Sequence, residues 1–518
     1  MSVSNSGVWK PIAENIELNA LDSNTAAVMA VVDTVRTTLG PKGLDKLLVD
    51  QAMNRHVTND GVTILLSLRT IHPVARMIVE IAERQEQLVG DGTTTAVVMA
   101  AEMIKEGKRM IRELGIHPTK IIHGIDSGIK HACKLLEKQA IPISLNDVAL
   151  QHVVKTSLNS KLDGENMANL VLSTIKELGP NAKYNGKFDF DKNIKVIRKI
   201  NMDDKIVNGL VLERKRLDLE LPLEVKNAKI LIVKFDLKPI KESWIKENKR
   251  YEEILKMEED KLAKAKDIVN KIISTGANTI LIASPEIDEI VENLIISKKL
   301  FAIRISSDEI ESISRYTAAK PVRMLENLND NDILGTANRI YEDEENDLIC
   351  IENGSNRNMV SVLVGGTTKE TSLERWRATR DGINAAEAAL NKGTVAGGGA
   401  AELHLIEKVK NLKLNGLEQV GITVVTVALE SIMRQILTNA GYNGLEKVMA
   451  ASTLPDNFGI DLESGKTVDM LKIGVVDPLL VKTTALKAAG EIVKSVMRID
   501  RNLAAEDLSP QAVSESKR

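Results

Sequence analysis

The spacing of apolar residues changes twice along this 518-residue chain, and that change constrains the fold more than any single motif. From about residue 14 to residue 142, and again from about residue 372 onward, apolar residues recur at the spacing of amphipathic helices. The middle of the chain instead carries short apolar runs of strand length at 229–233, 279–283, 301–305 and 360–364, alternating with helical patterns. An α/β domain inserted into a mostly helical domain explains this order.

Charge and cysteine content exclude several classes of protein. The 69 lysine and arginine residues nearly balance the 72 aspartate and glutamate residues, whereas nucleic-acid-binding domains usually carry a clear basic excess. Cys133 and Cys350 are too few for a disulfide framework or a cysteine-based zinc site, which favours a reducing compartment. No apolar run approaches the ~18 residues that span a bilayer, and the N-terminus has no apolar signal core. We therefore expect a cytoplasmic protein that binds neither nucleic acid nor membranes.

The sharpest local signal is a glycine-flanked aspartate followed by three threonines, Gly90-Asp91-Gly92-Thr93-Thr94-Thr95. Glycine allows a positive φ and lets the backbone approach a ligand closely. A helix beginning at the threonines would present unpaired N–H groups that suit phosphate, and Asp91 could hold a Mg²⁺ that bridges phosphate oxygens. Taken alone, the run is more often an Asp-Gly turn followed by a threonine-rich helix start.

Three further signals are individually weak. A helix over residues 26–37, capped by Asn24 or Thr25, would end at the turn 38–43, which can present N–H groups but is more often a plain helix C-cap. The acidic turn 58–61 also has an ordinary Asp-Gly explanation. Three glycines at 397–399 suit either a base or sugar, or close helix packing.

Two charged side chains complete the set of candidates. Asp381 lies on a predicted helix among arginines, where a carboxylate is usually half of a weak surface ion pair. Lys161 would usually be solvated. Standard nucleotide motifs are missing, because the nearest approach to a P-loop, residues 416–423, has Ile422 where that motif requires lysine.

Taken together, these segments resemble the chaperonin family over essentially the whole chain. The matching motifs follow the family's order and spacing: TTLGPKG at 37–43, TNDG at 58–61, GDGTTT at 90–95, VAGGG at 395–399 with Asp381 ahead of it, and VDM and GVVDP at 468–470 and 474–478. At residues 44–50, 157–161 and 497–500 the sequence is more similar to the group II, thermosome-like branch of the family. A divergent bacterial thermosome-like (group III) member is the alternative, because residues 212–221 depart from the family's usual sequence.

The resemblance implies a multidomain α and α/β subunit. Its mostly helical equatorial domain would bind ATP, its small intermediate domain would act as a hinge, and its α/β apical domain would carry a helical protrusion that serves as a lid. The implied segments are 1–142 and 393–518 (equatorial), 143–208 and 366–392 (intermediate), and 209–365 (apical), with the protrusion near 237–265. Its tip would carry Trp244, Ile245, Ile254 and Leu255.

The resemblance also implies roles for individual residues. Asp91 would hold Mg²⁺, and the phosphates of ATP would lie against Leu39, Gly40, Pro41, Gly61, Gly92, Thr93, Thr94 and Thr95. Asp60 and Asp381 would orient and deprotonate the attacking water, and Lys161 would reach toward the γ-phosphate. Gly398 and Asp477 would contact the base and the ribose. Asp381 would reach the ATP only after its segment swings down, so that hydrolysis is coupled to lid closure.

An ATP-driven folding machine is therefore the expected function. Its subunits would assemble into stacked rings that enclose non-native proteins without a separate co-chaperonin lid. A chaperonin-like scaffold that no longer hydrolyses ATP is one alternative, but such a protein should have lost Asp60, Asp91 or Asp381. A small-molecule kinase that uses the same phosphate site is another, although the sequence supplies no acceptor site.

Overall fold

The computed structural model describes residues 10–11, 20–51, 53, 55–68, 70–184, 186–239, 251–284, 286–330, 332–355 and 359–504. The chain divides into two compact units, Met1–Ala168 with Arg380–Arg518, and Asn169–Thr379. The first unit is thus built from both ends of the chain. The multidomain α and α/β class is confirmed, whereas the finer equatorial, intermediate and apical boundaries stay predictions. Trp244 and Ile245, expected near the tip of the protrusion, lie outside the described residues.

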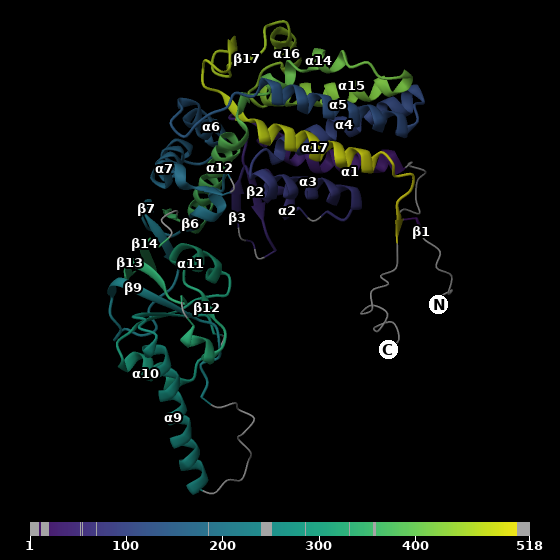
Figure 1. Cartoon of the computed structure of the whole chain (residues 1–518). Coiled ribbons are helices and arrows are strands. Elements are labelled where there is room, and N and C mark those ends of the chain that lie inside the picture. Colours follow the sequence, from purple (N-terminus) through teal and green to yellow (C-terminus); the bar gives the residue numbers. More distant parts are fainter. Residues whose placement is uncertain are drawn as a thin grey trace, which may run out of the picture. The chain divides into compact units, whose positions relative to one another are not determined.

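Long helices packed side by side form the core of the first unit (Figure 1). The central four are α4 (Thr93–Leu114), α5 (Pro118–Gln139), α15 (Gln419–Asn439) and α17 (Leu479–Val496), with α1 (Ala20–Val35) and α3 (Pro73–Val89) packed against them. The apolar side chains of this core are almost entirely Val, Ile, Leu, Ala and Met, which fits the aromatic content of only 3%. This aliphatic core fixes the ends of α3 and α4, where the acidic turn lies.

Shorter elements surround this core. The helices are α2 (Gly61–Ser67), α6 (Val148–Leu158), α13 (Ala400–Leu403), α14 (Ile406–Lys410) and α16 (Gly444–Ser452). The antiparallel strand pairs are β1 (Lys10–Pro11) with β20 (Leu503–Ala504), β2 (Lys46–Val49) with β3 (Arg55–Thr58), β16 (Thr394–Ala396) with β19 (Val476–Pro478), and β17 (Phe458–Ile460) with β18 (Thr467–Asp469).

The start of α1 differs from the expected one. The helix begins at Ala20 rather than at residue 26, so Asn24 and Thr25 lie within its second turn and are not its cap. Both side chains are buried, and the Thr25 hydroxyl donates to the Leu21 carbonyl at 2.7 Å, as threonine does inside a helix. Packing against the helical core therefore outweighs the capping preference of these two residues.

Helix α15 corrects the expectation that no stretch has the length and hydropathy of a membrane span. The helical stretch Gly416–Asn439 has a mean hydropathy of 1.5 over its most apolar window, and 61% of that window is buried inside the protein. Because α15 packs against α4 and α5, its apolar character is that of a core helix. The segment resembling a P-loop falls in a short 3₁₀ turn, Gly416–Glu418, and the start of α15.

The second unit contains the α/β fold. Its large sheet has the strand order β11-β10-β9-β13-β14-β8, with β12 (Pro321–Val322) paired to the end of β9. The strands are β8 (Gly209–Leu212), β9 (Glu224–Val233), β10 (Thr279–Ile282), β11 (Phe301–Arg304), β13 (Gly335–Asp343) and β14 (Leu348–Gly354). Strands β9, β10 and β11 are parallel and separated by α9 (Tyr251–Ser274) and α10 (Glu289–Ser297), as the alternating pattern predicted. Helix α11 (Glu309–Thr317) follows β11.

Three strands form a smaller sheet in this unit. Strand β15 (Val360–Val364) lies between β6 (Ile194–Arg198) and β7 (Lys205–Val207). The remaining elements are the hairpin β4 (Lys183–Tyr184) with β5 (Lys187–Phe188) and the short α8 (Phe190–Asn193). Helices α7 (Gly164–Leu178) and α12 (Lys369–Lys392) each contain residues of both units.

Candidate functional site

The acidic turn between α3 and α4 depends on its two glycines. Gly90 and Gly92 have φ of 69° and 76°, the left-handed region that side chains with a Cβ rarely adopt. A Cβ on Gly92 would also lie 2.5 Å from Cγ1 of Val481, and one on Gly90 would lie 1.9 Å from the Asn384 amide nitrogen. Backbone conformation and packing therefore both fix this turn, and α4 begins directly after it.

No side chain caps the N-terminus of α4, because the N-cap position is Gly92. The first residues of the helix, Thr93 and Thr94, are buried. Helix α2 begins beside them, since a Cβ on Gly61 would lie 2.3 Å from Oγ1 of Thr94. Two helix N-termini thus meet at one place, and the uncapped N–H groups and dipole of α4 favour an anionic ligand.

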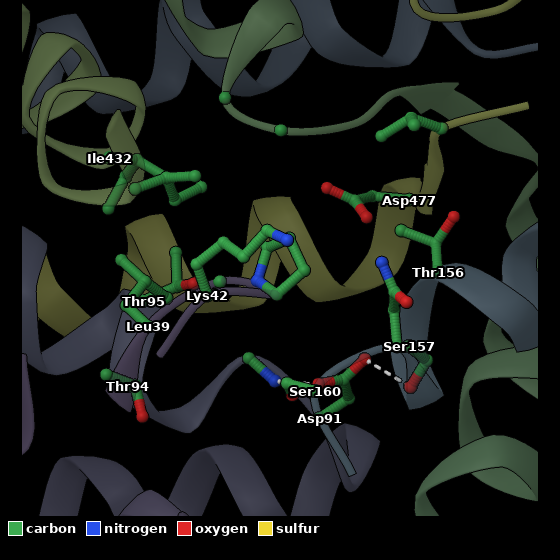
Figure 2. A pocket seen from close by; sticks show the side chains of 18 of the residues that line it. Leu39, Lys42, Asp91, Thr94, Thr95, Thr156, Ser157, Ser160, Ile432 and Asp477 are labelled. Atoms are coloured by element: carbon green, nitrogen blue, oxygen red, sulfur yellow. Dashed lines mark hydrogen bonds between the residues drawn. The ribbon is translucent and has the colours of Figure 1, made fainter. Parts of the chain in front are cut away.

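Asp91 projects from the turn into a cavity. Its Oδ1 accepts from its neighbour Gly92 N at 2.6 Å, and its Oδ2 accepts from the Ser157 hydroxyl at 3.2 Å (Figure 2). Burial raises the pKa of Asp91, although both hydrogen bonds oppose the rise. A cation beside this carboxylate would offset the cost of keeping it ionised.

Asp60 is the N-cap of α2. Its Oδ2 accepts from Thr63 N at 3.1 Å and from the Thr63 hydroxyl at 2.5 Å. Its neighbour Asn59 donates to the Ser160 carbonyl, which ties this turn to the segment that carries Lys161. The cap explains why Asp60 has a defined orientation beside the starts of α2 and α4.

Asp381 and Lys161 form a nearly buried ion pair. Lys161 Nζ lies 3.0 Å from Asp381 Oδ2, and the two side chains are 14% and 16% exposed. Burial raises the pKa of Asp381 to about 8, with Lys161 opposing the rise and Asp60 adding to it. Burial alone would lower the pKa of Lys161, but Asp381 and Asp60 outweigh it, so the ammonium keeps its proton.

The opposite wall of the cavity comes from three separate segments. Gly40, with φ of 88°, packs on Ile436 of α15, and Asn439 of the same helix donates to the Leu39 carbonyl at 2.8 Å. Gly398, with φ of 63°, lies between β16 and α13, and Asp477 lies on β19. Figure 2 shows Asp477 facing the cavity from the side opposite Asp91.

All the residues singled out by the sequence line one cavity of about 510 Å³ in the first unit: Leu39, Gly40, Pro41, Asp60, Gly61, Asp91, Gly92, Thr93, Thr94, Thr95, Lys161, Asp381, Gly398 and Asp477. A cavity of this size suits a nucleotide-sized ligand. Segments more than 300 residues apart in the sequence, such as Asp60 and Asp381, therefore do gather at one place. The individual roles assigned to these residues stay predictions.

Sequence reasoning missed several residues of the cavity. Glu86 lies one helical turn before Gly90, and burial raises the pKa of its carboxyl, with Asp60 adding to the effect. Lys482 lies five positions after Asp477, and its Nζ lies 2.7 Å from Oδ2 of Asp477. The sequence indicated Glu86 only through its position one helical turn before the predicted ligand-binding turn. No sequence pattern indicated Lys482 as a residue of the cavity.

The cavity carries an excess of acidic side chains. Seven carboxylates line it against three lysines: Asp60, Glu86, Asp91, Asp381, Asp461, Glu463 and Asp477 against Lys42, Lys161 and Lys482. Among the described residues, no cluster of three His, Cys, Asp or Glu side chains could hold a metal unaided. Mg²⁺ commonly binds through one or two carboxylates together with substrate phosphates, and it would offset the negative charge. The residues present therefore fit Mg²⁺ that arrives with a phosphorylated ligand.

Comparisons with known proteins show which family this chain resembles. The family model described as the TCP-1/cpn60 chaperonin family matches residues 31–507. Thermosome subunit alpha of Methanothermobacter thermautotrophicus is 33% identical over 500 residues, covering 93% of this chain and 90% of that protein. Thermosome subunit beta of Sulfurisphaera tokodaii is 33% identical over 522 residues, covering 96% and 93%. A solved structure of a group III chaperonin in the open state has a TM-score of 0.78 at 32% identity, covering 93% of this chain and 98% of the other.

These matches confirm the resemblance stated from the motifs, including its thermosome-like character. They span almost the whole chain and almost the whole of each relative, so they concern the complete architecture rather than one shared domain. Together with a cavity built from the family's dispersed motifs, they identify this chain as a member of the TCP-1/cpn60 chaperonin family.

Proposed function

We propose that this chain is an ATP-hydrolysing subunit of a double-ring chaperonin, in which turnover of ATP with Mg²⁺ closes a built-in lid over non-native protein. One observation carries the proposal: Asp60, Asp91, Asp381 and Lys161 line the same cavity as two helix N-termini. Phosphoryl transfer needs chiefly positioning and charge stabilisation, and this combination supplies both.

Each acidic group has a distinct task in the proposed reaction. Asp91, half-buried and aimed into the cavity, is the candidate metal ligand, and the metal when bound would neutralise charge on the phosphate oxygens. The uncapped N–H groups at the start of α4 bind phosphate. Asp381, when ionised, accepts a proton from the attacking water, and Asp60 orients that water. Lys161 holds Asp381 in place and offers an ammonium to the terminal phosphate.

The direct test measures phosphate release by the assembled protein with and without an unfolded client. Turnover of ATP together with protection of the client from aggregation supports the proposal. Binding of client without any phosphate release would instead identify a scaffold. The intact mass of the native assembly gives the ring size and separates a stacked ring from a monomeric ATPase.

The rate should depend on pH because of Asp381. With a pKa of about 8, this carboxyl is protonated below that pH and cannot accept a proton, so kcat/KM should rise as the pH increases through about 8. Lys161 lowers the pKa of Asp381, so Lys161→Met should move the inflection to higher pH. Measuring kcat/KM between pH 6 and 10, in buffers of constant ionic strength, checks the shift. Lys42→Met, at a half-exposed lysine of the same cavity, should leave the inflection in place, and an unmoved or lower inflection in Lys161→Met would contradict the assignment.

Deleting residues 241–258 should leave ATP hydrolysis within about twofold of the wild-type rate, because the described residues that line the cavity all come from residues 38–161 and 381–482. Enclosure of a client should be lost if the segment forms the lid. Protease digestion of a captured client, with and without ATP, measures enclosure. Protection by the deletion variant equal to that by the full chain would show that the segment is not the lid.

A further inference from the structure

A buried lysine joins two carboxylates at the edge of the cavity. Lys482, in the first turn of α17, is 6% exposed at its side chain, and its Nζ lies 2.6 Å from Oε1 of Glu402 and 2.7 Å from Oδ2 of Asp477. The Glu402 side chain is 1% exposed and lies on α13, behind the wall, whereas Asp477 and Lys482 line the cavity. The contact therefore connects three segments, α13, β19 and α17.

The charges of this triad do not balance. Burial alone would lower the pKa of Lys482, but Asp477 and Glu402 outweigh it, so the ammonium remains charged. One ammonium then faces two carboxylates, which leaves a net charge of about −1 in a mostly buried place. The ammonium has three donor hydrogens, so it can contact both carboxylates at once. The second carboxylate, Asp477, is the one that faces the cavity in Figure 2.

The same turn of α17 also touches the acidic turn on the phosphate side. Val481 packs on Gly92, and the Gln85 amide donates both to the Val481 carbonyl at 3.3 Å and to the Asp91 carbonyl at 2.8 Å. The segment that holds Asp477 is thus fixed relative to the candidate metal ligand. A rigid distance between these two carboxylates would set how far a bound molecule extends from its phosphates to its sugar.

We propose that Lys482, itself held by Glu402, is a positioning residue that locks the Asp477 carboxylate in the orientation that accepts hydrogen bonds from the ribose hydroxyls of ATP. The inference rests on the proposed nucleotide site and deepens it. Lys482 gives one oxygen of Asp477 a fixed partner, so the carboxylate cannot rotate to optimise other contacts. The pair Lys482–Glu402 therefore makes the site selective for a nucleotide with intact sugar hydroxyls.

The test compares the Kd of ATP with that of 2′,3′-dideoxy-ATP for the assembled full-length protein with Mg²⁺. Hydrogen bonds to an ionised group are strong, so wild-type protein should prefer ATP by about tenfold or more. The informative variant is Lys482→Met with Glu402→Gln, because removing one positive and one negative charge keeps the net charge of the triad. In this double variant the preference should fall to about twofold or less, with dideoxy-ATP bound as in the wild type. The value of kcat at saturating ATP should stay within about threefold, since the sugar contact does not take part in phosphoryl transfer.

Two further variants make the result decisive. Asp477→Asn should abolish the preference, and adding it to the double variant should cause no further loss, because both changes remove the same interaction. Lys494→Met breaks another ion pair of α17, 2.9 Å from Asp126 and outside the cavity, and should leave the preference unchanged. If the double variant does not assemble, Lys482→Gln with Glu402→Gln provides the same comparison of the two nucleotides, because it keeps the net charge of the triad and a polar group at both positions.

The outcomes separate this inference from the proposed function. If wild-type protein and the double variant keep the same preference for ATP, while Asp477→Asn loses it, Lys482 has no positioning role and the nucleotide site stands. Equal weakening of both nucleotides in the double variant would likewise overturn the inference, because a merely structural lysine predicts that result. If wild-type protein binds neither nucleotide, the proposed function and the inference both fall.

Discussion

Replacing Asp381 with alanine is expected to lower the rate of ATP hydrolysis by about 100- to 10,000-fold, the usual contribution of a positioned general base. The affinity for ATP should stay within about threefold or improve slightly. Asp381 is one of seven carboxylates in the cavity, so its removal reduces the repulsion of a triphosphate. Single-turnover hydrolysis and equilibrium binding of ATP, measured on the same assembled protein, separate the two effects.

Two companion variants test whether the loss is specific to Asp381. Asp381→Asn keeps the shape of the side chain and removes its basicity, so it should be as inactive as Asp381→Ala. Lys392→Ala changes an exposed residue at the end of the same helix and should hydrolyse ATP at the wild-type rate. Full turnover by Asp381→Ala would remove this carboxylate from the mechanism and leave Asp60 as the remaining candidate base.

The second large effect concerns Asp91. We expect Asp91→Asn to weaken the binding of ATP with Mg²⁺ by about 100-fold or more, because the amide does not replace a carboxylate as a ligand of Mg²⁺. The turn itself should survive, since the Asn side-chain oxygen can still accept from Gly92 N, as Asp91 does at 2.6 Å. Titrating ATP with saturating Mg²⁺ and again with a chelator measures both the affinity and its dependence on the metal.

The dependence on the metal gives the sharper result. Wild-type protein should lose most of its affinity for ATP when Mg²⁺ is removed, since the cavity is already rich in negative charge. Asp91→Asn should bind ATP weakly with or without the metal. Glu463→Gln is the matched control, because it removes one carboxylate of the same cavity that is 78% exposed at its mouth. A Mg²⁺ dependence in Asp91→Asn equal to that of the wild type would place the metal elsewhere.

Local chemistry explains why much of the site was predictable. A positive φ and close contacts require glycine at positions 90 and 92, and a glycine on each side of an aspartate can be recognised in the sequence. The parallel strands β9, β10 and β11 were also predictable, because buried parallel strands have continuous apolar runs. By contrast, β13 mixes polar, charged and apolar residues without strict alternation, and the four apolar residues that begin β14 are followed at once by Glu-Asn-Gly, so neither has a clear strand pattern.

The sequence patterns did not predict which side chains of the site contact one another. Lys482 has no periodic or motif signal, and only the packing of α17 against the strand β19 and α13 makes it the partner of Asp477 and Glu402. The predicted start of α1 was wrong for a related reason. The burial of Asn24 depends on segments distant in sequence, and the side-chain amide of Asn502 donates to the Asn24 side-chain oxygen at 2.6 Å. Long-range contacts of this kind outweigh local capping preferences of about 1 kcal/mol.

The sequence by itself determined the local conformations: the glycine turns, the helix that begins at Thr93, the parallel strands and the family to which their order belongs. These follow from backbone sterics and apolar spacing, which act between near neighbours in the chain. Only the tertiary structure decided that Asp60, Asp91, Asp381 and Lys161 line one cavity. It also decided that Lys161 and Asp381 form an ion pair there. Electrostatic interactions and burial depend on distances in space, and those distances exist only once remote segments have packed together.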